Sequence, residues 1–264
     1  MKKTLKLALK LILVGVLIYL FPRFMIFYLL CGLYDVSRNR PLTWKLLQKY
    51  FLSKGIVLWI LSPFNILMDL LTLPYINKGI YRLEDLPGRY QDEVNRLIEV
   101  VKSADIDALL REKTTTYGRS MIFFKWYRKN IKNEIVIPEF HEDYRFITTV
   151  GISTFNKKVS TSAHFGPLRA SLRVLYNINL VQGREAWIEV GDHKHYWSDS
   201  QLFIFDDTLL HQSVNQTDDL RYCLFVDIIR PSVINGLMRQ IVTFLHITMS
   251  SVNGIFYKNW KKIH

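Results

Sequence analysis

Apolar positions form long runs near the two ends of the chain and short alternating runs in its middle. The first long run, residues 11–34, carries a single charge, Arg23. A helix of this length extends about 36 Å, which is enough to cross the roughly 30 Å apolar core of a bilayer. A secretory signal peptide is the alternative, but the run is long for one and no small-residue cleavage site follows it. We therefore expect a membrane-associated helix here.

A second apolar run covers residues 55–76, with the sequence GIVLWILSPFNILMDLLTLPYI. Pro63, Asn65 and Asp69 interrupt it. Polar side chains and a proline are costly inside a simple membrane span. The pattern leaves open whether this segment spans the membrane, re-enters it or lies flat on it.

Near the other end, apolar residues recur at helical spacing while polar residues fill the opposite side. The apolar set is Ile234, Leu237, Met238, Ile241, Phe244, Leu245 and Met249. This pattern predicts an amphipathic helix, either an interfacial membrane anchor or a helix packed on the protein's own core.

The middle of the chain changes from helical to strand periodicity. Residues 92–113 have helical spacing with an interruption near Ser103, and from Tyr144 onwards short apolar runs are separated by turn-like pieces. The runs read FITTVGIST, ASLRVLYNINLV, AWIEVG, HYWS, QLFIFDD, LLHQSVN and RYCLFVDII. Their number and spacing predict a mainly β domain, either an antiparallel sandwich or a small barrel.

Three regions result: a membrane-associated helical region over 1–80, a β domain over 81–231 and a C-terminal amphipathic or membrane helix over 232–264. The 35 Lys and Arg residues against 23 Asp and Glu give a net charge of +12. Much of the excess flanks the apolar runs, so it predicts a phospholipid bilayer as partner and no nucleic acid. The two cysteines, Cys31 and Cys223, indicate no disulfide framework.

Two histidines and two arginines recur at matching intervals in the β domain. Arg173 follows His164 by nine residues, and Arg221 follows His211 by ten, both in apolar strands. A lone histidine in such a place is most often structural, but a buried arginine needs an anionic partner. The four residues together predict a pocket for a metal ion and a dicarboxylate.

A second histidine pair, His193 and His195, would share one face of a strand. This spacing suits metal ligands. It is also common on exposed hairpins, so the pair alone is a weak indication of a metal site.

Strand alternation tests whether His211 and Arg221 can face the same interior. We expect a hairpin around the sequence NQTDD to connect their strands, and if both side chains face the interior its loop must contain three or five residues, since a two-residue loop would turn Arg221 outward. The same alternation places Cys223 and Phe225 on the inner face. Cys223 would then line the pocket, and we interpret it as a small buried apolar side chain.

These residues belong to a longer set of motifs. They are H-x-G-P from His164, the arginine at 173, F-D-D-x-x-x-H ending at His211, the arginine ten residues later, and V-D-x-x-x-P ending at Pro231. Residues 146–231 thereby resemble the aspartyl/asparaginyl β-hydroxylase family of iron(II)- and 2-oxoglutarate-dependent dioxygenases. The resemblance implies a double-stranded β-helix (jelly-roll) barrel with flanking helices, to which the sequence adds N- and C-terminal membrane-associated helices.

The resemblance also implies roles for individual residues. His164 and His211 would bind iron(II), and Arg221 would bind the distal carboxylate of 2-oxoglutarate through a bidentate pair. Ser153 and Arg173 stand where the family also contacts this cosubstrate, although Ser153 is equally explained as an ordinary strand serine. Molecular oxygen would be the third reactant.

Gly166 departs from the usual dioxygenase pattern, which has a carboxylate ligand two residues after the first histidine. The family tolerates this glycine, with water in the vacant position, and a halogenase needs the same vacancy. We expect Asp206 and Asp207 to hold the turn before His211 rather than to bind metal.

The implied activity is hydroxylation of an unactivated C–H bond. The apolar ends, their basic flanks and the segment FFKWYRKN (123–130) resemble the layout of bacterial membrane enzymes that hydroxylate acyl chains of lipid A or ornithine lipids. A membrane lipid is therefore the first hypothesis. An aspartyl, asparaginyl or other peptide side chain is the second, which Gly166 favours, and a non-catalytic binding barrel is the third. Access to iron(II) and 2-oxoglutarate favours a cytoplasmic catalytic domain at the bacterial inner membrane.

Overall fold

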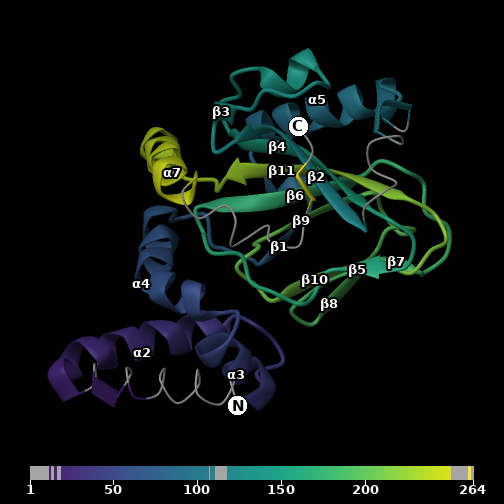
Figure 1. The fold of residues 1–264 in the computed structure, drawn as a ribbon. Coiled ribbons are helices and arrows are strands. Elements are labelled where there is room, and N and C mark those ends of the chain that lie inside the picture. Colours follow the sequence, from purple (N-terminus) through teal and green to yellow (C-terminus); the bar gives the residue numbers. More distant parts are fainter. Residues whose placement is uncertain are drawn as a thin grey trace.

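Two β-sheets face each other, with helices on the outer side of one sheet and at one end of the molecule (Figure 1). The computed structural model describes residues 12, 15–16, 19–106, 108–110, 118–250 and 261–262, with side chains from 12 to 245. The predictions for residues 1–11 and for Met249 thus lie outside the described side chains. All other statements on structure refer to these residues.

The larger sheet has the strand order β1-β9-β6-β11-β4-β2-β12, with β3 beside β2. Its neighbours run antiparallel except for the β12–β2 pair. The strands are β1 (Ile80–Tyr81), β2 (Arg119–Trp126), β3 (Lys129–Asn130), β4 (Ile147–Phe155), β6 (Ser171–Asn177), β9 (Leu202–Phe205), β11 (Arg221–Ile229) and β12 (Lys261–Lys262).

The smaller sheet is antiparallel throughout, in the order β5-β10-β7-β8. Its strands are β5 (Val159–Ser160), β7 (Ala186–Val190), β8 (His193–Tyr196) and β10 (His211–Asn215). All seven strands expected from the sequence form, and two facing antiparallel sheets give the mainly β, jelly-roll type of sandwich. Strand β2 was not predicted, although its sequence RSMIFFKW is almost continuously apolar.

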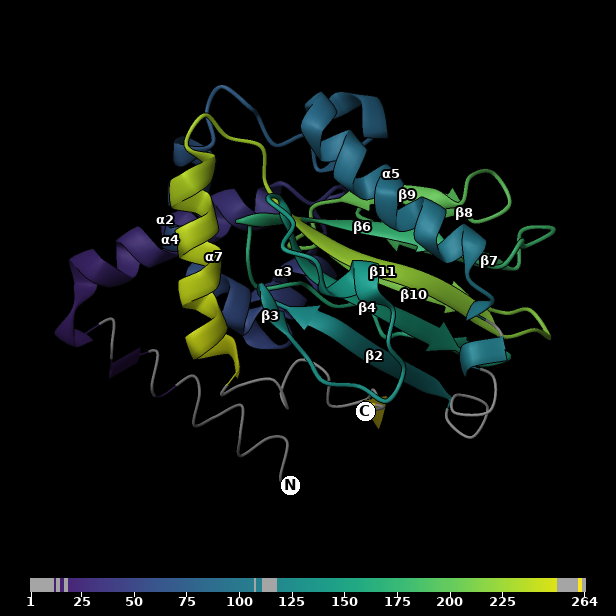
Figure 2. The same ribbon diagram turned by 90° about the horizontal axis from the view of Figure 1, so that it is seen from above.

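Strand β11 shows how alternation builds two separate cores. Its residues Tyr222, Leu224 and Val226 face outward into a core shared with α5 (Gly88–Ser103). Cys223 and Phe225 face inward, into the core between the sheets. Seen from above, α5 lies along the larger sheet (Figure 2). The helix ends at Ser103, where the sequence predicted an interruption, because Ala104 is extended.

The remaining helical elements connect or flank the sheets. The helices α2 (Pro22–Ser37), α3 (Trp44–Leu52) and α4 (Ile56–Leu71) pack together at one end, and α7 (Asn235–Ser250) lies beside the larger sheet. Two short 3-10 turns are η1 (Leu83–Asp85) and η2 (Pro138–His141). We call residues 35–72, which contain the end of α2, α3 and α4, the helical base.

The first apolar run is not one continuous helix in its described part. Phe21 has φ −134° and ψ 58°, outside the helical region, and α2 begins at Pro22. Proline is favoured at a helix start because its missing N–H has no partner there in any case. Within the described residues no single helix is long and apolar enough to span a bilayer, whereas α3 and α4, bent by 89°, pass the length and composition test together.

Helix α7 confirms the predicted amphipathic helix, but its apolar residues are divided between a buried and an exposed side. Met238 and Val242 are buried in the core of the larger sheet, as the core-packing alternative requires. Leu237 and Phe244 are exposed and form a second apolar side. Membrane association of these helices stays a prediction, as do the boundaries 1–80, 81–231 and 232–264.

Candidate functional site

One pocket between the sheets collects the residues singled out from the sequence. Ser153, His164, Arg173, His211 and Arg221 all line it, from four strands and the segment after β5. The cavity volume is about 120 Å³. Residues up to 68 positions apart in the chain therefore meet because the two sheets face each other.

The two histidines lie side by side as a small antiparallel bridge. The His164 N–H donates to the His211 carbonyl at 3.0 Å, and the His211 N–H donates to the His164 carbonyl at 2.9 Å. The ring centroids are 4.2 Å apart. This backbone pairing sets the spacing of the two imidazoles.

Each imidazole is oriented by a carbonyl two residues earlier. Nδ1 of His164 lies 2.8 Å from the Ser162 oxygen, and Nδ1 of His211 lies 2.8 Å from the Leu209 oxygen. A carbonyl only accepts, so Nδ1 carries the proton and Nε2 keeps a free lone pair. Burial lowers the pKa of His164 to about 4, and burial with the neighbouring His164 lowers the pKa of His211 well below its usual value.

This is the form in which histidine binds metal, neutral and held by a second hydrogen bond. The pair therefore fits a metal ion. No cluster of three or more His, Cys, Asp or Glu side chains suited to a metal occurs in the described part of the chain. The two histidines are thus its protein ligand candidates.

Packing explains why position 166, two residues after the first histidine, is a glycine. A Cβ at Gly166 would lie 2.2 Å from Oδ2 of Asp207, and the Gly166 N–H donates to the Asp207 carbonyl at 2.7 Å. The Asp207 carboxylate therefore fills the space that a side chain at 166 would need. Burial and the nearby Asp227 carboxylate raise the pKa of Asp207, against the effect of Arg173.

Asp206 and Asp207 differ in role. Asp206 holds the turn as predicted, since its Oδ1 accepts from Thr208 N at 2.9 Å and from Thr208 Oγ1 at 2.7 Å. The same expectation is wrong for the side chain of Asp207, which lines the pocket and pairs with Arg173 at 3.0 Å. Adjacent residues of a strand or tight turn point in different directions, so the two aspartates of the F-D-D motif have different partners: Asp206 contacts the turn and Asp207 contacts the pocket.

Arg221 lies fully buried with no carboxylate partner among the described residues. Nη1 donates to Asn177 Oδ1 at 3.2 Å and Nη2 donates to Ser213 Oγ at 2.8 Å, while Nε is unpaired. The guanidinium stacks 4.2 Å from the Phe155 ring centroid. A buried cation held only by neutral groups favours binding of an anion.

Carboxylates neutralise the charge of Arg173, whereas none neutralises the charge of Arg221 among the described residues. It pairs with Asp207 and Asp227, at 3.0 Å each, and stacks over Phe225 at 4.1 Å. Arg221 is therefore the stronger candidate for an incoming carboxylate. Ser153 lines the pocket, and its hydroxyl donates to the Cys223 carbonyl at 3.3 Å.

The connection from His211 to Arg221 contains five loop residues, 216–220, but it is not a hairpin. Strands β10 and β11 belong to different sheets, so the chain crosses the sandwich here. Both side chains face the pocket because the sheets face each other. Cys223 lines the pocket too, and burial raises its pKa to about 11, which keeps the thiol neutral.

The second histidine pair is engaged in ring contacts outside this pocket. His193 and His195 stack on Phe203 with centroid distances of 5.7 and 4.5 Å, and Nε2 of His195 lies 2.9 Å from the Ser200 carbonyl. These contacts account for the spacing noted in the sequence.

Part of the pocket lining is apolar. Met121 and Trp126 of β2 lie there with Leu175 and Phe225. The β2–β3 turn adds Tyr127, with φ 42°. An unpredicted strand therefore supplies part of the surface that a substrate would contact.

Fold and site together define a β-sandwich protein with a neutral two-histidine centre facing a buried arginine. Residues 91–231 match the family model described as aspartyl/asparaginyl beta-hydroxylase, and the chain belongs to this family. Over 122 residues it is 26% identical to the ornithine lipid ester-linked acyl 2-hydroxylase of Rhizobium tropici. That match covers 44% of this chain and 43% of the relative, so less than half of either protein is compared.

Two solved structures resemble part of this chain, with low TM-scores. A 2OG-Fe(II) oxygenase family oxidoreductase from Burkholderia pseudomallei is 13% identical with a TM-score of 0.27, covering 33% of this chain and 44% of that one. A cupin 2 conserved barrel domain protein from Salinispora arenicola is 15% identical with a TM-score of 0.28, covering 44% and 82%.

Proposed function

We propose that the protein is an iron(II)- and 2-oxoglutarate-dependent hydroxylase acting on an acyl chain of a membrane lipid. The observation that carries the proposal is Arg221, a buried cation without a carboxylate partner among the described residues, in the same pocket as two neutral histidines. A dicarboxylate that also binds a metal satisfies both features at once. In a barrel that binds no anion, the buried charge of Arg221 would stay uncompensated.

Each residue would contribute binding or orientation. His164 and His211 would hold iron(II) through Nε2, because their Nδ1 atoms are already occupied. Bound iron(II) with 2-oxoglutarate and oxygen supplies oxidation of an unactivated C–H bond, with succinate and carbon dioxide as coproducts. Arg221 would bind the distal carboxylate, with Ser153 and Arg173 lining the same pocket, and the apolar walls would exclude water from the reacting carbon.

Two observations support a lipid substrate. The pocket walls contributed by Met121, Trp126, Leu175 and Phe225 suit an alkyl chain, and the curated relative is named for an acyl group of ornithine lipid. Gly166 does not favour a peptide substrate over a lipid, because its lack of a side chain is explained by packing against Asp207.

Exposed apolar side chains support placement at a bilayer. Phe27 and Leu30 of α2, Leu70 of α4, and Leu237 and Phe244 of α7 all face solvent in the isolated molecule. Such concentrations of exposed apolar side chains are typical of membrane or protein contact surfaces. We propose the bacterial inner membrane, with the catalytic domain on the cytoplasmic side, where iron(II) and 2-oxoglutarate are present.

Lipidomics and turnover test the proposal. Purified protein with iron(II), 2-oxoglutarate and extracted lipid should form succinate and a lipid heavier by one oxygen, and His211→Ala should form neither. His195→Ala is the matched control and should remain active. A lipid pool unchanged between cells with and without the gene would refute the lipid substrate, and an active His211→Ala would refute the metal assignment.

A further inference from the structure

The histidine bridge has a second side, which faces the helical base. Phe165, next to His164, and Leu210, next to His211, pack against a core that contains Tyr50 and Leu58. The Tyr50 and Phe165 rings meet edge to face at 5.7 Å. Because neighbouring residues of an extended chain point to opposite sides, the histidines face the pocket while Leu210 packs on the helices, and Phe165 packs on the helices and also borders the pocket.

Asn39, just after α2, holds the peptide that orients His211. Its Oδ1 accepts from the Leu210 N–H at 2.6 Å. The carbonyl of the same Leu209–Leu210 peptide accepts from Nδ1 of His211 at 2.8 Å. Asn39 is 1% exposed, so this contact is shielded from water. A rotation of that peptide would turn the His211 ring.

Lys54, between α3 and α4, contacts the His164 segment on both sides of the peptide that orients His164, through a side chain and a carbonyl rather than through that peptide itself. Its ammonium donates to Ser162 Oγ at 2.6 Å and to the Ala163 carbonyl at 3.4 Å. The Ser162 carbonyl in turn accepts from Nδ1 of His164. Lys54 is exposed, so its effect should be smaller than that of Asn39.

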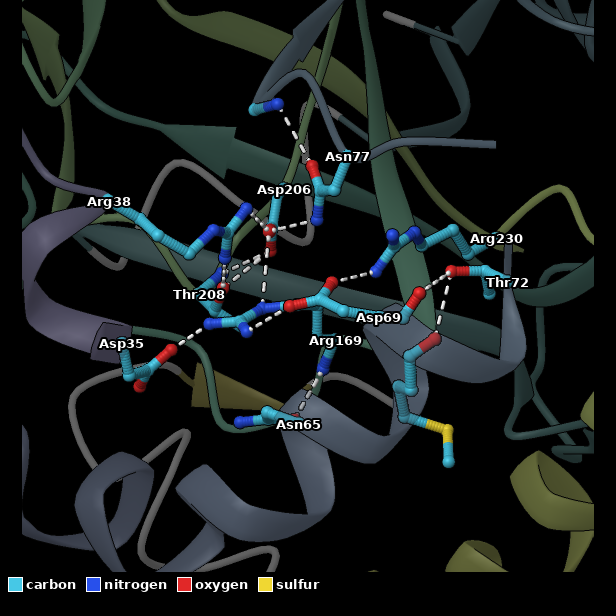
Figure 3. A network of polar contacts seen from close by, with 12 residues as sticks. Asp35, Arg38, Asn65, Asp69, Thr72, Asn77, Arg169, Asp206, Thr208 and Arg230 are labelled. Atoms are coloured by element: carbon cyan, nitrogen blue, oxygen red, sulfur yellow. Dashed lines mark hydrogen bonds and ion pairs between the residues drawn. The ribbon is translucent and has the colours of Figure 1, made fainter. Parts of the chain in front are cut away.

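A buried ion network fixes the base against both histidine segments (Figure 3). Arg169, on the segment after His164, pairs with Asp35 of α2 and with Asp69 of α4 at 2.7 Å. Asp206, on the turn before His211, accepts from Arg38 at 2.8 Å. Asn65 and Asp69, which interrupt the second apolar run, are thus contacts to the catalytic domain, since Asn65 also binds the Arg169 N–H at 2.9 Å.

We propose that Asn39 and Lys54 are positioning residues of the two-histidine site, so that the helical base is part of the catalytic centre as well as a membrane-facing element. This inference rests on the proposed function. Loss of a partner that orients a metal-binding histidine typically weakens metal affinity about 10- to 100-fold. Asn39 and Lys54 act one residue further out, so we expect about 10-fold for Asn39→Ala and about 3-fold for Lys54→Ala.

Co²⁺ binding to the full chain without cosubstrate tests this directly. Asn39→Ala should raise the Co²⁺ dissociation constant and shift the cobalt ligand-field absorption at saturation, since the His211 ring is free to turn. Asn39→Asp, which keeps the oxygen acceptor, should retain more affinity than Asn39→Ala. The matched controls are Asn133→Ala, which removes a contact to the Phe123 carbonyl, and Lys45→Ala, an exposed lysine of α3. Both controls should bind Co²⁺ like the wild type.

The outcomes separate the two claims. Wild-type protein that binds no Co²⁺, or His211→Ala that binds it equally well, would refute the metal site and with it the proposed function. Wild-type binding with Asn39→Ala and Lys54→Ala indistinguishable from their controls would refute the positioning role alone. If Asn39→Ala does not fold, the exposed Lys54 variant decides by the same measurement.

Discussion

Two arginines of this protein are equally buried but lie in opposite electrostatic surroundings. Arg169, in the helical base interface, is within ion-pair distance of Asp35, Asp69 and Asp206. Arg221, in the pocket, has hydrogen bonds to the neutral residues Asn177 and Ser213. Both are at most 1% exposed. Burial alone therefore does not distinguish these two arginines, whereas the presence or absence of neighbouring carboxylates does.

The largest loss of stability is expected for Arg169→Met. It leaves three carboxylates near one another without their shared cation, and breaking a buried ion pair in this way costs about 3–5 kcal/mol. We expect the free energy of unfolding to fall by that amount in chemical denaturation. A variant as stable as the wild type would show that the network contributes nothing net.

Arg221→Met should show the reverse behaviour. Removing an uncompensated buried cation should change the free energy of unfolding by less than about 1 kcal/mol. Affinity for 2-oxoglutarate should fall about 100-fold, because a charge-assisted pair to its carboxylate is lost. Calorimetry with Co²⁺-loaded protein measures the affinity, and an unchanged value would exclude Arg221 from cosubstrate binding.

Asp206→Asn tests the ion network around Arg169 through the pH dependence of stability. Although burial opposes ionisation, Arg38 and Arg169 hold the pKa of Asp206 well below its usual range. The ionised carboxylate therefore stabilises the folded protein. This stabilisation is complete at pH values above the pKa of an aspartate in the unfolded chain, about 3.9, and is lost as the pH falls towards the lower pKa of Asp206 in the folded protein. We expect the variant to lose about 2 kcal/mol at pH 7 and to show a weaker decline below pH 4 in denaturation curves. Parallel wild-type and variant curves would contradict this assignment.

The smallest effect is expected at the second histidine pair. His195→Ala removes stacking on Phe203 but no residue of the pocket. Its Co²⁺ affinity should stay within about 2-fold of wild type, and its stability should fall by about 1 kcal/mol. A large loss of Co²⁺ affinity would instead locate a metal site on β8.

Local patterns predicted what depends on neighbours in sequence. Alternation gave all seven expected strands and the shared inner face of Cys223 and Phe225. Those side chains are decided by the period of a single strand, without knowledge of its partner. Arg221 could be identified in the same way, because a charge in an apolar strand requires an explanation.

What the sequence could not provide depends on contacts between distant segments. Arg169 and Asp69 are 100 residues apart, so neither predicts the other. Asp69 interrupts an apolar run in the sequence, whereas in the structure its carboxylate pairs with Arg169 and Arg230. The crossing between sheets at 216–220 was likewise mistaken for a hairpin, since loop length does not reveal which sheet the next strand joins.

The contact between Gly166 and Asp207 limits how this centre can change over evolution. A carboxylate introduced at 166 alone would collide with the one at 207, whose Oδ2 lies 2.2 Å from the Cβ position. A side chain at 166 therefore requires the Asp207 carboxylate to move or residue 207 to become smaller. The two positions share one volume, so we expect substitutions at 166 to depend on which residue stands at 207 and on how its side chain is oriented.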